Sequence, residues 1–175
     1  MSGGFSNGER EMQEPKMIFV VVGTQYGFDR LIQTGDDWAA KHPEFEFFAQ
    51  IGVGKFKPRN MEFVDFLDPT TFKNKLGACE CIVAHAGMGS ILQSLENGKP
   101  VIVMPRNPDL GEVQNTHQLD TARRMRENVS IEVAMDENEL ATRLDTFMAE
   151  TRRAVIGSSA SCELISSIRR SIHEE

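Results

Sequence analysis

A short glycine-rich segment is the part of this sequence best suited to chemistry. Gly87 and Gly89 follow an apolar run that ends at His85, and Ser90 comes directly after them. Glycine has no Cβ, so backbone amides at these positions can approach a ligand closely. Ser90 can cap a helix whose unpaired N-terminal amides and partial positive charge would face an anion. The segment therefore predicts a site for a phosphorylated ligand.

The residues after the glycines have the spacing of a short helix. Ile91, Leu92 and Leu95 would form its buried face, Gly98 would end it, and Pro100 would lead into the next strand. A tight strand-to-helix turn would use the two glycines equally well. We favour anion binding because a capped helix start follows them directly.

A second polar cluster, residues 105–118, follows the next apolar run. Arg106 comes after the buried strand, where a guanidinium can pair with phosphate or carboxylate, although a solvated surface residue is the simpler alternative. Gln118 also has a structural alternative, because Asn115 and Gln118 have the spacing of a capping box. His117 has no such alternative. In a parallel sheet both loops open at one edge, where the cleft would suit a nucleotide sugar.

Two further side chains remain ambiguous. His85, at a strand end, can be a structural imidazole or a ligand contact. Gln93 lies on the helix face opposite the apolar one, so it can face the cleft, as any exposed glutamine could.

The elements that position these residues alternate along the chain. We expect strands at 17–22, 45–51, 61–67, 131–134 and on both sides of the glycine segment. We expect helices at 28–40, from an Asp68 cap to Leu76, and at 115–127. This alternation predicts an α/β fold with a doubly wound parallel sheet, in which ligands bind at the carboxyl ends of the strands. Gly23, His85 and Pro105 all fall at such ends.

The composition limits the classes of protein to consider. The chain has 175 residues, three cysteines and a net charge of −7, which predicts one domain and no nucleic-acid partner. Cys79 and Cys81 have neither CxxC nor zinc-knuckle spacing, which indicates a reducing cytosol. No apolar run approaches the roughly 20 residues that span a bilayer, and no signal peptide is evident. We expect a soluble, cytoplasmic chain.

Three regions are expected along the chain. Residues 1–16 have the composition of a flexible leader, 17–150 form the ligand-binding domain, and 151–175 form a helical extension. Before the extension, Leu140, Leu144, Phe147 and Met148 share one helical face. Within the extension, isoleucines flanked by arginines favour a helix packed on the sheet, and an arm that docks on a partner or an anionic membrane is the alternative.

Several catalytic motifs are absent from the sequence. It contains no Asp-x-Asp pair for a nucleotide-bound cation, no Walker lysine loop and no obvious Ser/His/Asp triad. No GxGxxG follows the first strand, which argues against a dinucleotide dehydrogenase. The predicted site therefore binds and polarises a ligand without offering a nucleophile.

Taken together, the motifs at 18–25, 28–31, 85–91 and 98–100 resemble the C-terminal, donor-binding half of the family 28 glycosyltransferases. The resemblance covers about residues 17–150. It is closest to the split members, in which this half is a separate chain: the Alg13 type and, nearer still, the PssE type of exopolysaccharide synthesis. The segments 104–106 and 112–118 favour the PssE type.

This resemblance implies a Rossmann-like GT-B half that binds a UDP-sugar without a metal or other cofactor. Gly23 and Thr24 would lie near the diphosphate, and the helix start would lie over the phosphates and ribose. The family's paired glutamines fall on His117 and Gln118, and its ribose-binding glutamate falls on Gln93, where an amide lacks charge-assisted strength. The implied donor-binding residues are Gly23, Thr24, Gln25, His85, Gly87, Met88, Gly89, Ser90, Gln93, Arg106, His117 and Gln118.

The resemblance also implies a missing half. The acceptor and the catalytic base would come from a membrane-associated, PssD-like or Alg14-like partner carrying a polyprenyl-linked acceptor. The chain would then be a poor catalyst alone and would be recruited to the cytoplasmic membrane face. Arg106 has two equally weighted interpretations. It can pair with the carboxylate of a uronic acid donor, UDP-glucuronate, or it can contact phosphate or solvent. The rival hypotheses are a noncatalytic activating or anchoring subunit and a stand-alone epimerase or phosphorylase-like enzyme.

Overall fold

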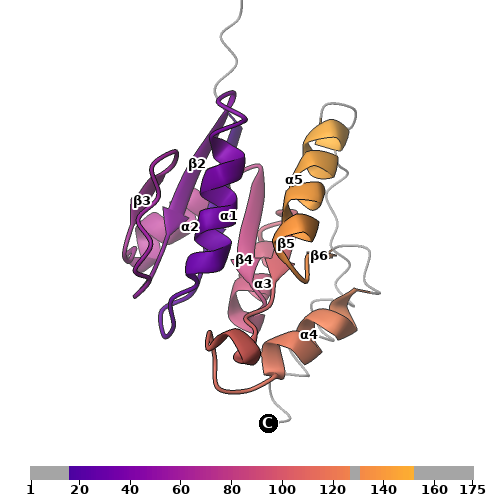
Figure 1. Cartoon of the computed structure of the whole chain (residues 1–175). Helices are drawn as coiled ribbons and strands as arrows, with labels where there is room; N and C mark the ends of the chain where they lie inside the picture. The colour runs from indigo at the N-terminus through magenta and orange to yellow at the C-terminus, as the bar shows by residue number, and fades with distance from the viewer. Residues whose placement is uncertain (1–15, 127–130, 152–175) are drawn as a thin grey trace, which may run out of the picture.

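The structure is a computed structural model of the chain, and it describes residues 16–126 and 131–151. Strands and helices alternate along these residues (Figure 1). The strands are β1 (Lys16–Val21), β2 (Phe45–Gln50), β3 (Glu62–Val64), β4 (Cys81–His85), β5 (Val101–Met104) and β6 (Ile131–Val133). The helices are α1 (Asp29–Ala39), α2 (Pro69–Ala78), α3 (Met88–Glu96), α4 (His117–Met125) and α5 (Glu137–Thr151), with a 3-10 helix, η1 (Pro108–Leu110), before α4.

The strands form one parallel sheet in the order β3-β2-β1-β4-β5-β6. The chain moves outward from β1 to β3, returns to the middle at β4, and moves outward again to β6. The direction of winding therefore reverses between β1 and β4. Open α/β sheets hold their ligands at such a switch point. The predicted doubly wound fold is confirmed.

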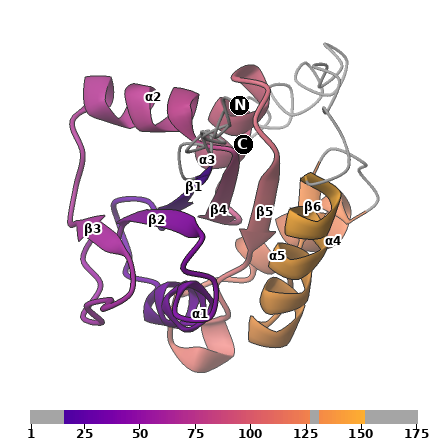
Figure 2. The same ribbon diagram turned by 90° about the horizontal axis from the view of Figure 1, so that it is seen from above.

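Helices cover both faces of the sheet (Figure 2). On one face α1 and α5 pack on the sheet through Leu31, Ile32, Leu140 and Leu144, all at most 1% exposed. On the other face α2, α3 and α4 contribute Leu76, Ile91 and Ala122 to a second core. The strands between them are apolar on both sides because both faces are covered.

The predicted helices have the expected buried faces. Ile91, Leu92 and Leu95 of α3 are buried, and Gly98 follows the helix with a positive φ of 64°. Phe147 of α5 is buried as expected, whereas the side chain of Met148 lies outside the described part. The Asp68 cap of α2 is confirmed, because its carboxylate accepts hydrogen bonds from the amides of Thr70 and Thr71. The third strand is shorter than expected, ending at Val64.

Two predicted caps are wrong. Gly87, in an extended conformation, is the N-cap of α3, so Ser90 lies inside the first turn. The predicted capping box of Asn115 and Gln118 does not form, because Thr116 is the N-cap of α4. In both places the helix begins elsewhere than expected, and the Asn115 side chain accepts from the amide of His117 instead.

The predicted leader and extension fall mostly outside the described residues. Of these two regions only Lys16, in β1, and Thr151, the last residue of α5, are described. Among the described residues, none of the helices combines the length and the apolar character needed to cross a bilayer.

Candidate functional site

The carboxyl ends of β1, β4 and β5 bring the predicted donor residues to one edge of the sheet. Residues 23–25 follow β1, His85 ends β4, and residues 105–116 follow β5. The loops that leave these strands lie together at the lower end of the sheet in Figure 1. The expectation that Gly23, His85 and Pro105 share one edge is confirmed by the parallel pairing of the three strands.

The imidazole of His85 fills the space over two of the predicted glycines. A β-carbon at Gly23 would lie 2.9 Å from Cε1 of the ring, and one at Gly87 would lie 2.7 Å from its Cδ2. Gly23 also has a φ of 80°, which side chains rarely adopt. These two positions therefore require glycine because of His85, whether or not a ligand approaches them.

His85 is a neutral, half-buried imidazole at neutral pH. Its Nδ1 lies 3.4 Å from the carbonyl oxygen of Val21, and because a carbonyl only accepts, Nδ1 carries the proton. Burial, and after it the charge of Arg106, lowers the pKa of His85 to about 4. The ring cannot offer a positive charge to a phosphate near pH 7. This geometry favours the structural alternative for His85.

The start of α3 is the open part of the glycine segment. Gly89 is exposed, and a β-carbon there would meet no atom within 4 Å. Met88 and Ser90 on either side of it are half-buried, and Gln93 one turn later is exposed. The first amides of a helix lack partners within the helix, so this end of α3 offers donors and partial positive charge. Gly89, unlike Gly87, leaves room for a ligand.

Arg106 does not face an open site. Its side chain is buried, with the residue only 2% exposed. The guanidinium donates to the backbone carbonyls of Val22, Tyr26 and Gly27 in the loop after β1. Burial lowers the pKa of Arg106 to about 10, so it stays charged at neutral pH. The expectation that Arg106 pairs with a donor carboxylate or phosphate does not agree with this arrangement.

Gln118 contacts the backbone of Arg106 in place of the predicted capping partner. The amide N–H of Arg106 donates to Oε1 of Gln118 over 3.1 Å. A backbone N–H can only donate, so the oxygen must face it and the NH₂ group is left to donate elsewhere. His117 is exposed beside it. Asn115 Oδ1 accepts from the His117 amide at 3.2 Å, which orients the start of α4.

An ion pair that the sequence did not reveal supports the second loop. Nε of Arg30 lies 2.7 Å from Oε1 of Glu112, and its Nη2 donates to Oε2 over 2.9 Å. The same carboxylate accepts from the amide of Asn107 at 2.7 Å. Both side chains are at most 15% exposed. The pair links the first turn of α1 to residues 105–116 across 82 positions of sequence, a separation at which no local signal exists.

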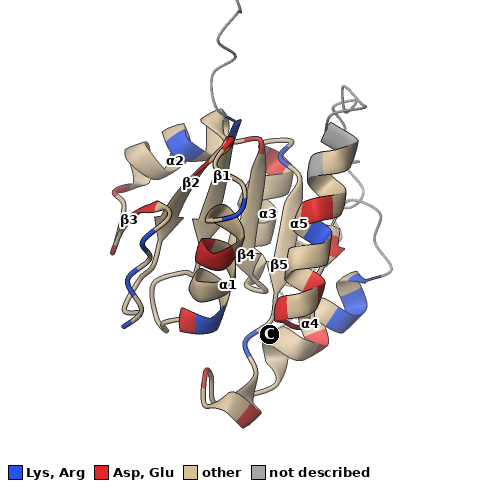
Figure 3. Cartoon of the chain, turned by 45° about the horizontal axis from the view of Figure 1, so that its top comes forward, with Lys and Arg blue, Asp and Glu red and all other residues tan. Residues whose placement is uncertain are grey.

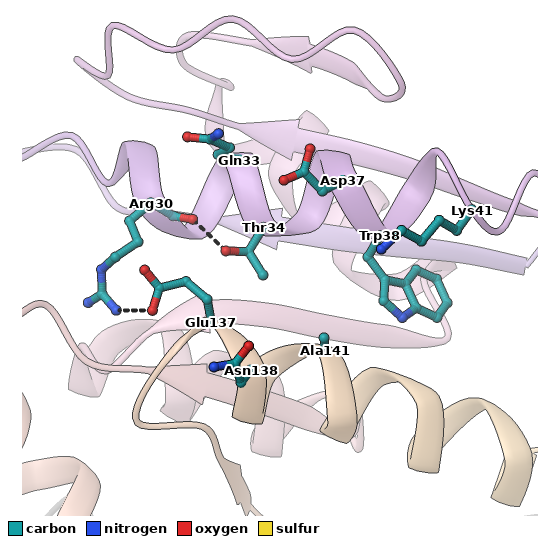
Figure 4. A pocket seen from close by; sticks show the side chains of 9 residues that line it. All are labelled: Arg30, Gln33, Thr34, Asp37, Trp38, Lys41, Glu137, Asn138 and Ala141. Atoms are coloured by element: carbon teal, nitrogen blue, oxygen red, sulfur yellow. Dashed lines mark hydrogen bonds and ion pairs between the residues drawn. The ribbon is translucent and has the colours of Figure 1, made fainter.

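A groove of about 480 Å³ lies between α1 and α5 (Figure 4). Figure 4 shows Arg30 and Glu137 paired at one end and Trp38 and Lys41 at the other. It reaches the carboxyl edge only at Arg30 and at the start of α5, where Glu137 pairs with Arg30, and none of the predicted donor residues lines it. The groove is therefore separate from the candidate site.

Charged residues of both signs are distributed along the described chain. In the ribbon of Figure 3, the Lys and Arg positions are interspersed with the Asp and Glu positions. Within residues 16–126 and 131–151, no cluster of three or more His, Cys, Asp or Glu side chains could hold a metal ion. The candidate site is thus built from backbone amides, polar side chains and glycines.

The strand order and the glycine loop at the switch point define a Rossmann-like domain, the fold of the C-terminal half of GT-B glycosyltransferases. The chain belongs to the family of the glycosyltransferase family 28 C-terminal domain, which it matches over residues 17–173. The match extends beyond residue 150, where the resemblance was expected to end. The family resemblance inferred from the motifs is confirmed.

Two relatives carry the name UDP-N-acetylglucosamine transferase subunit ALG13. The protein of Homo sapiens is 32% identical over 120 residues, and that of Mus musculus is 30% identical over 124 residues. Each match covers 63% of this chain and 10% of the relative. The chain therefore matches only a small part of those longer proteins.

Solved structures share the fold at low sequence identity. A solution structure of ALG13 has a TM-score of 0.61 at 18% identity, covering 90% of this chain and 95% of that one. The crystal structure of the kitacinnamycin glycotransferase has a TM-score of 0.59 at 20% identity, covering 98% of this chain and 43% of that one. The spinosyn rhamnosyltransferase SpnG, solved with thymidine diphosphate, has a TM-score of 0.55 at 14% identity, and the match covers 99% of this chain and 45% of that one. These likenesses concern the fold alone.

Proposed function

We propose that this chain is the donor-binding half of a two-component inverting glycosyltransferase and that it binds a UDP-sugar at the carboxyl edge of its sheet. The observation that carries the proposal is the start of α3, which lies at the β1–β4 switch point with Gly89 exposed and unobstructed. A helix N-terminus there favours a diphosphate through its amides and its dipole.

The exposed residues around this helix start would contact the rest of the donor. Thr24 and Gln25 are exposed beyond Gly23 and would lie near the diphosphate. Gln93, one turn into α3, would bind the ribose hydroxyls. The NH₂ group of Gln118 would donate to an oxygen of the hexose, since its Oε1 is held by Arg106.

The proposed reaction inverts the anomeric carbon. An acceptor hydroxyl attacks that carbon, the new C–O bond forms as the bond to the diphosphate breaks, UDP leaves, and the hydroxyl proton passes to a base on the partner. Negative charge develops on the leaving diphosphate, where the first amides of α3 would stabilise it. This chain would thus hold the donor and assist the leaving group.

The donor sugar is proposed as a hexose. UDP-N-acetylglucosamine is the first donor to test, because the human and mouse relatives are named as its transferase subunits. The UDP-glucuronate hypothesis rested on the PssE resemblance and on Arg106, whose guanidinium is buried against three backbone carbonyls. Arg106 therefore gives no support for a carboxylate on the sugar.

A second subunit is part of the proposal. The relatives' names include the word subunit, the matching family model describes a C-terminal domain, and the chain covers 43% of the kitacinnamycin glycotransferase. We expect a membrane-associated acceptor-binding partner that carries a polyprenyl-linked acceptor for polysaccharide or glycan assembly. It would recruit this chain to the cytoplasmic face of the membrane.

Calorimetric titration of the full chain with UDP tests the donor site. ADP and UMP are the control ligands, and Gly89→Trp is the blocking variant, because a β-carbon at this position would meet no atom within 4 Å and a large side chain there would occupy the proposed site. We expect saturable binding that prefers UDP and disappears in the variant. Binding of UDP that is unchanged in Gly89→Trp would contradict this location of the site.

The alternative of a noncatalytic anchoring subunit predicts a different result. Such a subunit would bind no UDP, alone or with its partner. Replacing His117 and Gln118 would then change neither complex formation nor turnover. A donor half should lose turnover on the same replacements while keeping the complex.

A further inference from the structure

Arg106 is a buried charge whose side-chain donors are paired with backbone carbonyls of this chain. It is 2% exposed, one of few buried polar or charged residues in the described part of the chain, and the others include Asp36 and Gln50. A guanidinium removed from water destabilises a protein unless its donors are paired. The hydrogen-bond partners of Arg106 therefore indicate its structural role.

The side chain of Arg106 binds one loop at several points. Nε donates to the carbonyl of Gly27 over 3.1 Å, and Nη2 donates to the carbonyls of Tyr26, at 2.6 Å, and Val22. Its guanidinium carbon lies 5.1 Å from the ring centroid of Phe28. Arg106 follows β5, and these partners follow β1, two places away in the sheet. The side chain thus spans the carboxyl end of β4.

The backbone of the same residue holds the second polar cluster. The N–H of Arg106 donates to Oε1 of Gln118 in the first turn of α4. One residue therefore joins the loop that contains Thr24 and Gln25 to the Gln118 amide. Thr24 and Gln25 are exposed, and the carbonyls that Arg106 contacts lie on both sides of them in the sequence.

We propose that Arg106 is a positioning residue of the donor site. It holds residues 22–27 in the conformation that receives the nucleotide and fixes the position of that loop relative to Gln118. This inference rests on the proposed function. It assigns Arg106 an action through the loop, with no direct contact to the donor. A loop held before the ligand arrives does not have to be ordered on binding, and this raises affinity.

The test replaces Arg106 in the full chain with Met or Lys. Met keeps an unbranched stem that reaches about as far as the Nε position and removes the charge and the donors, and Lys keeps the charge on a single donor group. UDP affinity is measured by calorimetry under conditions where circular dichroism shows each variant to be folded. Order of the loop is measured without nucleotide, from the amide exchange of residues 23–25.

Lys99→Met is the matched control. Nζ of Lys99 donates to the carbonyl of Cys79 over 2.8 Å, so this variant also removes a cation bound to a backbone carbonyl. Lys99 and Cys79 both precede their strands, at the opposite edge of the sheet. The Lys99→Met variant should disturb the fold locally without changing the donor site.

We expect Arg106→Met to weaken UDP binding at least tenfold and to speed amide exchange at residues 23–25. Arg106→Lys should recover part of both effects, and Lys99→Met should show neither. Unchanged affinity and exchange in a folded Arg106→Met would overturn the inference, and Arg106→Lys is judged by the same measurements if the Met variant does not fold. If the unaltered chain binds no UDP, the proposed donor site fails, while the exchange data still decide whether Arg106 orders the loop.

Discussion

The ring of His85 and the backbone of Gly87 share a space that has no room for a side chain between them. A β-carbon at Gly87 would lie 2.7 Å from Cδ2 of the imidazole, and one at Gly89 would meet nothing within 4 Å. Two glycines that look equivalent in the sequence therefore have different reasons to be glycine. The first accommodates His85, and the second leaves the end of α3 open.

Gly87→Ala and Gly89→Ala should consequently differ in stability. Alanine at 87 forces the ring or the backbone to move, and overpacking of this kind lowers the free energy of unfolding by roughly 1–3 kcal/mol. Alanine at 89, inside α3, should leave it unchanged or raise it by up to about 1 kcal/mol. Urea unfolding of both variants checks this, and equal effects would contradict it. Adding His85→Ala should remove much of the penalty at Gly87.

Stability should depend on pH through His85. Its pKa is lowered to about 4 in the folded chain from about 6.5 when unfolded. Between these values the unfolded state binds a proton that the folded state does not, so stability falls as pH drops from 6.5 to 4. His85 contributes up to about 3 kcal/mol to the free energy of unfolding, and this contribution is fully present above pH 6.5. Urea unfolding across this range should show a shallower pH slope in His85→Asn, and an identical slope would contradict the lowered pKa.

Gln118→Glu should weaken donor binding without disturbing the loop. A carboxylate can still accept from the Arg106 amide, but it replaces the outward NH₂ donor with negative charge. We expect UDP-sugar affinity to fall about tenfold to a hundredfold, corresponding to roughly 1.4–2.8 kcal/mol. Gln114→Glu makes the same charge change at an exposed position of this loop and is the control. Equal losses in the two variants would show that only long-range charge is acting.

The Arg30–Glu112 pair should stabilise the folded chain more than an exposed ion pair does. Its two hydrogen bonds and low exposure predict a coupling of about 1–3 kcal/mol in a double-mutant cycle with Arg30→Met and Glu112→Gln. The exposed Arg123–Asp120 pair, at 3.3 Å, should give at most about 0.5 kcal/mol and vanish in high salt. Equal coupling energies from the two urea-unfolding cycles would contradict the claim that the Arg30–Glu112 pair stabilises the fold more than an exposed pair.

The helices and strands were predictable because their signals are local. The apolar spacing of Leu31 and Ile32 in α1, the continuous apolar run of β1 and the Asp68 cap all act within a few residues. The alternation of these elements was enough to predict a parallel, doubly wound sheet, and the motifs at 18–25 and 85–91 were enough to identify the family. Helix starts were the weak point, as Ser90 and Asn115 show.

Only the tertiary structure decided what the polar side chains of the site do. Arg106 and Val22 are 84 positions apart, and Arg30 and Glu112 are 82 apart, so their pairing follows from strand order and not from spacing in the sequence. An arginine after a buried strand looks the same in sequence whether it faces a ligand or turns inward. The packed sheet turns Arg106 inward, because the carbonyls of the loop after β1 are close enough to pair its donors.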